Sequence, residues 1–299
     1  MKKVMLLAMV SMMIGMGNVT ALAQNTFEGE MVSKCHSVQK AKSQVTTKNV
    51  LAKMIVKNIM KKNFDNNPGF YTGTYTATTV VKGEKTRVHN SYNNCYTLIE
   101  KEGDKMKTTT YFPYIKKGYT QITDMTENQK QVEEMRKGEV EKTGETMTIL
   151  GHKCDVYKVK YEMKTDSAGT TSATNLHNEF AVFSDPSMPG ADQECLPGVK
   201  GVPLKVTVNT ASQITNEMMN IDFLMSVATI VTAITPRTVD DTEFEVPADI
   251  KLIDIEKKPK ELIKMLEDNK KYMMKKNLWT EESPDEAKIY DDLSEDWDY

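Results

Sequence analysis

Four histidines and pairs of adjacent carboxylates such as Glu133-Glu134 and Asp240-Asp241 are the residues whose types could support catalysis in this sequence. His177-Asn178-Glu179 is similar to part of a zinc-protease motif, but the second histidine at helical spacing is missing. The chain has no G-x-S-x-G turn, no phosphate-binding loop and no G-x-G-x-x-G segment. We therefore predict no catalytic residue and no cofactor, and an uncharacterised hydrolase is only our third hypothesis. The residues considered are His36, His89, His152, His177, Glu133-Glu134 and Asp240-Asp241.

The four cysteines lack the spacing of a redox or zinc motif. They are Cys35, Cys95, Cys154 and Cys195, and none belongs to a C-x-x-C pair. Histidines stand beside Cys35 and Cys154, but the remaining ligands of a metal site have no recognisable spacing, so we predict no metal. Three disulfide pairings stay open. A bridge between Cys154 and Cys195 would close a loop of about 40 residues and stabilise the fold by roughly 3–4 kcal/mol.

The first 23 residues have the three parts of a secretory signal peptide. Lys2 and Lys3 precede an apolar run from Val4 to Met16, and Ala21-Leu22-Ala23 forms an A-x-A cleavage site. The run is shorter than the roughly 20 residues that span a bilayer. No cysteine follows Ala23, so a lipid anchor of the bacterial lipoprotein type is not indicated. We predict cleavage after Ala23 and a soluble periplasmic or secreted protein with no transmembrane span.

Composition argues for one folded domain with an acidic extension. The chain has 299 residues, of which 39% are hydrophobic and 27% charged, with a net charge of −3. The hydrophobic content is enough to form a core. The net charge argues against a nucleic-acid-binding protein, which would normally be clearly basic. Residues 281–299 contain nine acids against Lys288 alone. We predict a single domain over residues 24–278 and a solvated tail over 279–299, which could dock an envelope protein.

The remaining pattern is rich in strands. Apolar residues at helical spacing predict amphipathic helices over Thr46–Phe64 and Pro259–Asn277. Thr123–Lys137 reads as a solvated helix or long loop, and Lys164–Leu176 and Asp185–Gly201 read as loops. Few helices among many hairpins exclude a doubly wound α/β fold. Strands are predicted at Tyr71–Val81, Arg87–Ser91, Tyr96–Lys101, Lys105–Tyr114, Glu145–Leu150, Asp155–Met163, Glu179–Ser184, Val202–Ser212, Phe223–Thr235 and Ile250–Ile255.

Three segments resemble exported proteins of Gram-negative bacteria. They are Thr146–Tyr157, with Ile149-Leu-Gly-His-Lys-Cys154; Phe180–Leu204, with Cys195-Leu-Pro-Gly-Val-Lys-Gly201; and Ile234–Pro247, ending in Phe244-Glu-Val-Pro247. Their order is similar to the GLPGLI family of domains of unknown function and to the superfamily of the lipoprotein carriers LolA and LolB. The resemblance implies an α+β fold, in which a strongly curved antiparallel sheet forms an incomplete barrel. An N-terminal helix would lie on its concave side, with a C-terminal helix beyond.

Two function classes follow from these observations. The first, preferred, is a non-enzymatic binding module of the cell envelope, because the resemblance implies a hollow that accepts a lipid or another apolar molecule. The second is a structural or interaction protein that works through its acidic tail or a sheet face. The same apolar strand faces could instead form a closed core, and the sequence leaves that open. The ligand-lining candidates are Tyr157, Val159, Tyr161, Leu204, Val206, Val208 and Met225.

Overall fold

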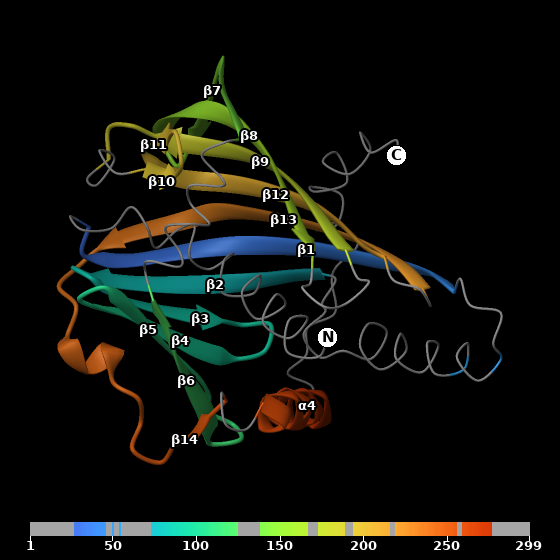
Figure 1. The fold of residues 1–299 in the computed structure, drawn as a ribbon. Helices are drawn as coiled ribbons and strands as arrows, with labels where there is room; N and C mark the ends of the chain where they lie inside the picture. Colours follow the sequence, from blue (N-terminus) through green and yellow to red (C-terminus); the bar gives the residue numbers. More distant parts are fainter. Residues whose placement is uncertain are drawn as a thin grey trace.

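Twelve strands form one open, curved sheet in the order β14-β6-β5-β4-β3-β2-β1-β13-β12-β9-β8-β7 (Figure 1). The computed structural model describes residues 27–45, 50, 54, 73–124, 138–166, 173–188, 194–215, 219–255 and 259–276. β14 and β6 pair in parallel, and the other pairs described are antiparallel. The predicted large antiparallel sheet is therefore confirmed in its coarse form. The strands of this sheet are β1 (Gly29–Val45), β2 (Gly73–Lys82), β3 (Lys85–Asn90), β4 (Cys95–Glu102), β5 (Lys105–Phe112), β6 (Lys117–Asp124), β7 (Glu139–Ile149), β8 (His152–Asp166), β9 (Ala173–Asp185), β12 (Val202–Thr215), β13 (Met219–Pro236) and β14 (Lys251–Asp254).

The long central strand β1 has no counterpart among the sequence predictions. It pairs with β13 along its whole length and with β2 over Gly29–Ser37, so it joins the two halves of the sheet. Its buried side chains include Ser33, Cys35 and Ser37, which are small or polar. The alternation of apolar and polar residues that marks a strand in a sequence is therefore missing.

Two loop predictions are wrong in part, and a third segment is mostly outside the described residues. β8 continues to Asp166 and β9 begins at Ala173, so both ends of the predicted loop Lys164–Leu176 are strand. The predicted loop Asp185–Gly201 contains a small separate sheet of β10 (Glu194–Leu196) and β11 (Val199–Lys200). Residues 123–124 belong to β6, while 125–137 lie outside the described residues. Where these segments form strands, they are held by hydrogen bonds to neighbouring strands, although their polar local sequence does not predict a strand.

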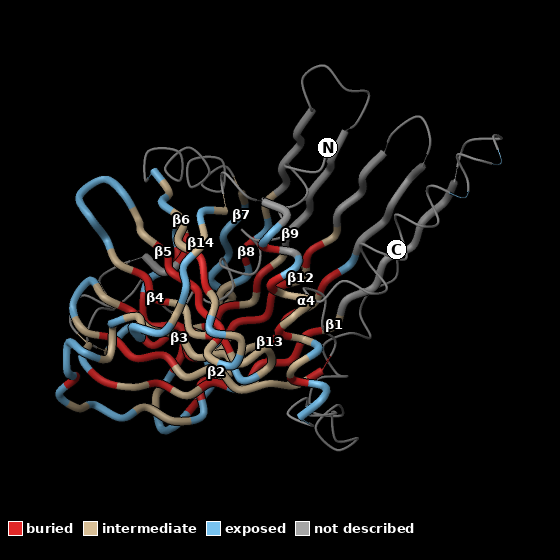
Figure 2. Tube along the Cα trace, turned by 90° about the horizontal axis from the view of Figure 1, so that it is seen from below, coloured by how far each residue is buried: buried red, intermediate tan, exposed pale blue. Residues whose placement is uncertain are grey.

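The two faces of the sheet differ in chemistry. Register across the strands places Cys35, Val206, Val182 and Tyr157 on one face, which we call the apolar face. The opposite face, which we call the charged face, carries lysines and acids among apolar residues such as Val156, Phe183 and Ile230. Figure 2 shows the buried positions concentrated along the central strands. Lysines and acids on the charged face include Lys34, Lys82, Lys85, Arg87, Glu100, Lys107, Lys158, Lys160, Glu179 and Lys205.

The C-terminal helix α4 (Pro259–Lys275) confirms the prediction over Pro259–Asn277 and covers one end of the apolar face (Figure 1). Leu262 and Met265 are buried against Cys95, Phe112 and Tyr119. Spacing of three and four residues puts apolar side chains on one side of the helix, which explains both its formation and its docking.

Several predictions fall wholly or mostly outside the described residues. Residues 1–23, predicted as a signal peptide, and the tail 279–299 are not described. Of the predicted helix Thr46–Phe64 only Val50 and Met54 are described; both are helical, with 71% and 60% of their surface exposed. Among the described residues, no helix is long and apolar enough to cross a membrane.

Candidate functional site

Six of the seven predicted lining residues share the apolar face. Val206 and Tyr157 flank Val182 in one cross-strand row, and Val208 and Val159 flank Phe180 in the next. Tyr161 and Met225 lie in a third row of the same face. The periodicity of two in β8 and β12 therefore identified one continuous surface. The members of the resulting cluster are Val159, Phe180, Val182, Leu196, Val199, Val206 and Val208, with Tyr157 and Tyr161 half-buried at its border.

The seventh candidate, Leu204, belongs to a different cluster. A bulge between Pro203 and Lys205 interrupts the pairing of β12 with β9. Leu204 is fully buried with Ile149, Cys154, Val202 and Val231. A bulge inserts one extra residue and changes which way the strand's side chains point. Strict alternation along β12 could not anticipate it.

The β10–β11 hairpin, here called the roof, covers the apolar cluster. Leu196 and Val199 point into the cluster and are 7% and 0% exposed. The roof pairs only with itself, as a sheet apart from the twelve main strands. Its contact with the cluster therefore rests on two apolar side chains rather than on a ladder of backbone hydrogen bonds. The sequence segment that resembles the GLPGLI motif is the segment that forms this roof.

Close backbone packing fixes the roof at its base. Gly201 adopts φ +100°, and a Cβ there would stand 2.3 Å from Ser184 Oγ and 2.9 Å from Asp185 O. Ser184 Oγ in turn donates a hydrogen bond of 2.7 Å to Lys200 O. Glycine is required both by this dihedral angle and by this approach. Gly201, the last residue of the segment Cys195–Gly201, thus holds the roof beside the end of β9.

A hydrogen-bonded carboxylate completes the base of the roof. Asp185 Oδ1 accepts bonds of 2.7 Å from both the backbone N–H and the Oγ of Ser187, and Asp185 Oδ2 lies 2.8 Å from His152 Nδ1. Burial alone would raise the pKa of Asp185, but the bonds from Ser187 and His152 outweigh it and lower that pKa. Asp185 is therefore held as an anion that organises the turn following β9.

The rim of the cluster carries one cation. Lys142 Nζ on the edge strand β7 lies 5.8 Å from the ring centroid of Tyr157 and 2.7 Å from Asp155 Oδ2. The hydrogen bond with Asp155 raises the pKa of Lys142. Two rows further along β8 from Tyr157, the ring of Tyr161 stacks on that of Phe180, with ring centroids 5.5 Å apart. Burial raises the pKa of Tyr161 to about 12. Tyr161 thus stays a neutral, largely apolar wall of the cluster.

The Cys154–Cys195 bridge is not formed. Cys154 is a free, fully buried thiol that donates a hydrogen bond of 3.7 Å to His152 O. Its side chain belongs to the second cluster beside Ile149 and Leu204, and the side chain of Cys195 lies outside the described residues. Burial raises the pKa of Cys154 to about 11, so this thiol remains protonated at neutral pH.

The residues considered for catalysis have structural partners where they are described. His36 Nδ1 lies 3.1 Å from Thr74 Oγ1, and His89 Nε2 lies 2.8 Å from Asn94 Oδ1. Asp240 caps the 3₁₀ helix η2 (Asp241–Phe244), and Asp241 pairs with Lys82 and Lys85. No group of three metal-ligating side chains occurs within the described part of the chain. Glu133, Glu134 and the side chain of His177 lie outside it.

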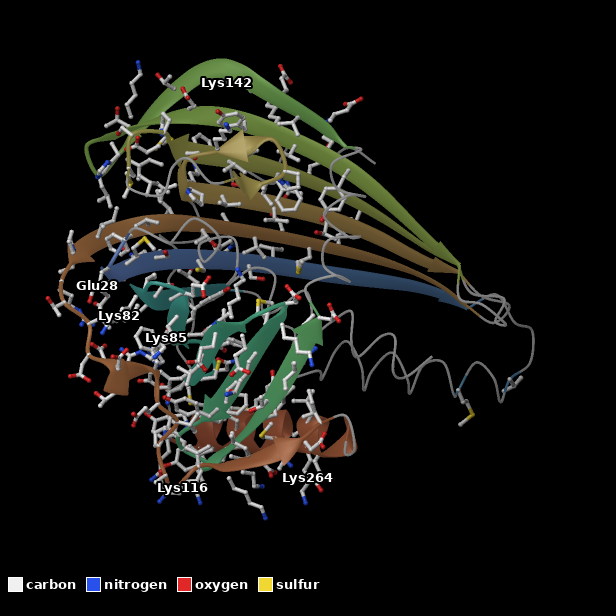
Figure 3. The ribbon with its side chains drawn as sticks, turned by 60° about the vertical axis from the view of Figure 1, so that its left-hand side comes forward. Glu28, Lys82, Lys85, Lys116, Lys142 and Lys264 are labelled. Atoms are coloured by element: carbon white, nitrogen blue, oxygen red, sulfur yellow. The ribbon has the colours of Figure 1, made fainter. Side chains whose placement is uncertain are left out.

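The charged face contains a hollow of about 400 Å³. Its ionic groups are paired: Asp241 lies within 3.4 Å of Lys82 and Lys85, and Glu84 lies 3.4 Å from Lys101. Figure 3 shows Lys82 and Lys85 next to each other above η2. Because lysines and carboxylates alternate, the hollow favours no ligand of one charge sign. Its walls are Lys82, Glu84, Lys85, Glu100, Lys101, Glu102 and Asp241.

Comparison with known proteins identifies no relative of this chain that would help to interpret this geometry. No family model matches the chain, and no curated protein matches it. The roofed apolar cluster is therefore interpreted from its own residues, and the resemblance to the GLPGLI and LolA/LolB families stays a prediction.

Proposed function

We propose that this protein is a non-enzymatic binding module of the periplasm or of the extracellular space. It holds a lipid or another apolar molecule between the apolar face and the roof. The observation that carries the proposal is that a hairpin of two short strands covers a broad apolar cluster, and that among its described side chains Leu196 and Val199 are the ones that belong to the cluster. The signal-peptide pattern of residues 1–23 supports the location.

Displacement of the roof by such a ligand exchanges one apolar contact for another. Moving the roof aside exposes aliphatic and aromatic side chains from β8, β9 and β12, at a cost near 25 cal/mol per Å² of apolar surface. An acyl chain that takes the place of Leu196 and Val199 restores this burial. The roof remains attached at Gly201, so it can close over the ligand again.

Binding of a fluorescent acyl probe tests the proposal on protein purified from its own cell envelope. Native mass spectrometry should first detect a co-purifying lipid mass, and the delipidated protein should then take up the probe. Val208→Trp places a bulky side chain in the cluster that the roof covers and should weaken probe binding at least tenfold. Lys158→Trp is the matched control, because Lys158 is exposed on the opposite face of the sheet, on β8, and should leave binding unchanged.

A second variant guards against simple misfolding of Val208→Trp. Leu196→Ala removes half of the roof's apolar contact and should raise the dissociation rate of the probe several-fold while the circular dichroism spectrum is kept. Clean apo protein that takes up no probe, although it is folded, would overturn the proposal and identify the cluster as a closed core.

A further inference from the structure

The outer side of α4 carries a row of lysines that the binding proposal does not use. Lys264, Lys271 and Lys275 follow one another at spacings of seven and four, which puts them on one side of the helix, and Lys276 comes next. All four are exposed, and Figure 3 shows Lys264 on the side of α4 away from the sheet. We call these four residues the lysine stripe.

The stripe differs from the lysines of the charged hollow in having no ionic partner of its own. No ion pair within 4 Å joins Lys264, Lys271, Lys275 or Lys276 to a carboxylate of the described residues. Of the acids on α4, Asp268 pairs with Lys117 at 3.5 Å, while Glu261 and Glu267 are the others. From residue 259 to 276 six lysines face three acids, so the helix surface is basic.

Exposed apolar groups border the stripe. Met274 is 58% exposed, and Tyr114, 41% exposed, stacks on Tyr272 of α4 with ring centroids 5.0 Å apart. A thioether and a phenol ring beside ammonium groups suit a ligand that combines negative charge with aromatic side chains. The surface therefore suits a ligand by its aromatic side chains as well as by its negative charge.

A segment with this chemistry follows α4 in the same chain. Residues 281–299 carry nine acids against Lys288, and Tyr290, Trp297 and Tyr299 stand among the acids. Nineteen extended residues reach about 60 Å, whereas α4 is only about 25 Å long. A segment tethered so close has an effective concentration in the millimolar range, so even a weak contact is populated.

We propose that the acidic segment 281–299 folds back and docks on the lysine stripe of its own α4. Its carboxylates lie against Lys264, Lys271, Lys275 and Lys276, and its aromatic residues contact Met274 and Tyr114. Bound in this way, the segment shields the basic helix from external polyanions. This inference is independent of the apolar ligand site.

Carbodiimide cross-linking of the full chain tests the contact directly, since it forms amide bonds only between touching lysines and carboxylates. Mass spectrometry should find links from the stripe to residues 281–298. Lys264→Glu/Lys271→Glu/Lys275→Glu should reduce their yield at least fivefold. Lys153→Glu/Lys158→Glu/Lys200→Glu is the matched control, because these three lysines are also exposed, two on β8 and one on the roof, and it should leave the yield unchanged. In a mixture of ¹⁴N and ¹⁵N protein, links within one isotope support the proposal and mixed links overturn it.

Tryptophan fluorescence gives a second readout that needs no mutation. The two tryptophans of the chain are Trp279 and Trp297, so the emission reports on the C-terminal segment alone. We expect blue-shifted emission at low salt and a red shift at 0.5 M NaCl, where screening shortens to roughly 4–5 Å. Emission that is solvent-like at low salt and unaffected by the charge reversals would overturn the proposal. So would full-length protein that binds phosphatidylglycerol vesicles as well as protein ending at Asn277 does, because the stripe would then be uncovered.

Discussion

His152 and Asp185 show how single residues hold the roof in place. Asp185 has 1% of its surface exposed, yet it keeps its charge because Ser187 and His152 satisfy both carboxylate oxygens. A buried anion without these partners would cost several kcal/mol. The roof that Cys195–Gly201 forms therefore depends on Asp185, which lies ten residues earlier in the chain, at the end of β9.

The lowered pKa of Asp185 predicts a component of acid sensitivity. A carboxyl group whose pKa is lower in the folded state stabilises the fold above its ordinary pKa of 3.8. That stabilisation is lost as the pH falls through the lowered value. Asp185→Asn should cost about 1–3 kcal/mol of unfolding free energy at neutral pH, and its acid unfolding curve should be flatter than that of the wild type.

Urea unfolding monitored by circular dichroism between neutral and acidic pH measures this effect. Asp249→Asn is the control, because Asp249 is 57% exposed in a surface pair with Lys116 and should change little. Equal pH profiles for the wild type and Asp185→Asn would contradict the assignment.

Among the elements, the helix α4 has two sides with different roles. Its inner side buries Leu262, Met265 and Met273, and Asn269 Nδ2 donates a hydrogen bond of 2.6 Å to Asn93 O. Its outer side is basic. The inner side is needed for the fold, and the outer side is free to bind.

Leu262→Ala should therefore destabilise the protein by about 2–4 kcal/mol, through the lost apolar contact and the cavity that remains. The matched change on the outer side, Met274→Ala, should cost less than about 0.5 kcal/mol. Chemical denaturation of both variants decides the point. A similar loss for both would mean that α4 does not dock through the side described.

At the scale of the whole molecule, the segment after β13 clamps the two halves of the sheet together. Glu243 accepts hydrogen bonds from Arg237 at 2.7 and 2.9 Å and from Arg87 of β3 at 3.0 Å. Glu28 Oε1, before β1, accepts a bond of 2.8 Å from the Val239 N–H. The segment thus links β13, β1 and β3 across the charged face. Hydrogen bonding to Arg237 lowers the pKa of Glu243, so the clamp is ionised at neutral pH.

Removing the charge at the centre of this clamp should destabilise the whole sheet. Glu243→Gln leaves two guanidinium groups facing a neutral amide, and we expect a loss of about 1–3 kcal/mol. Glu84→Gln, in the more exposed pair with Lys101, should cost at most about 0.5 kcal/mol. Thermal unfolding of the two variants at low salt compares them, and equal midpoints would refute the role of the clamp.

The sequence correctly predicts those elements whose own apolar residues repeat with the period of a strand or of a helix. Alternation in β8 and β12 predicted the surface that holds Tyr157, Val159, Val206 and Val208, and helical spacing predicted α4. Prediction from the sequence failed at β1, whose buried residues are mostly small or polar, and at the bulge that redirects Leu204. It also treated the roof as a loop, because two short strands leave no period to detect.

By itself the sequence determined that the protein is rich in antiparallel strands and which residues of β8, β9 and β12 are apolar on one face, since these properties repeat every two residues. Tertiary structure alone decided what covers that face. Leu196 and Val199 lie 30 and 33 residues beyond the end of β8 at Asp166, and the clamp and Cys154 likewise acquire partners from distant strands. Such contacts depend on the register of the whole sheet, which no local pattern encodes.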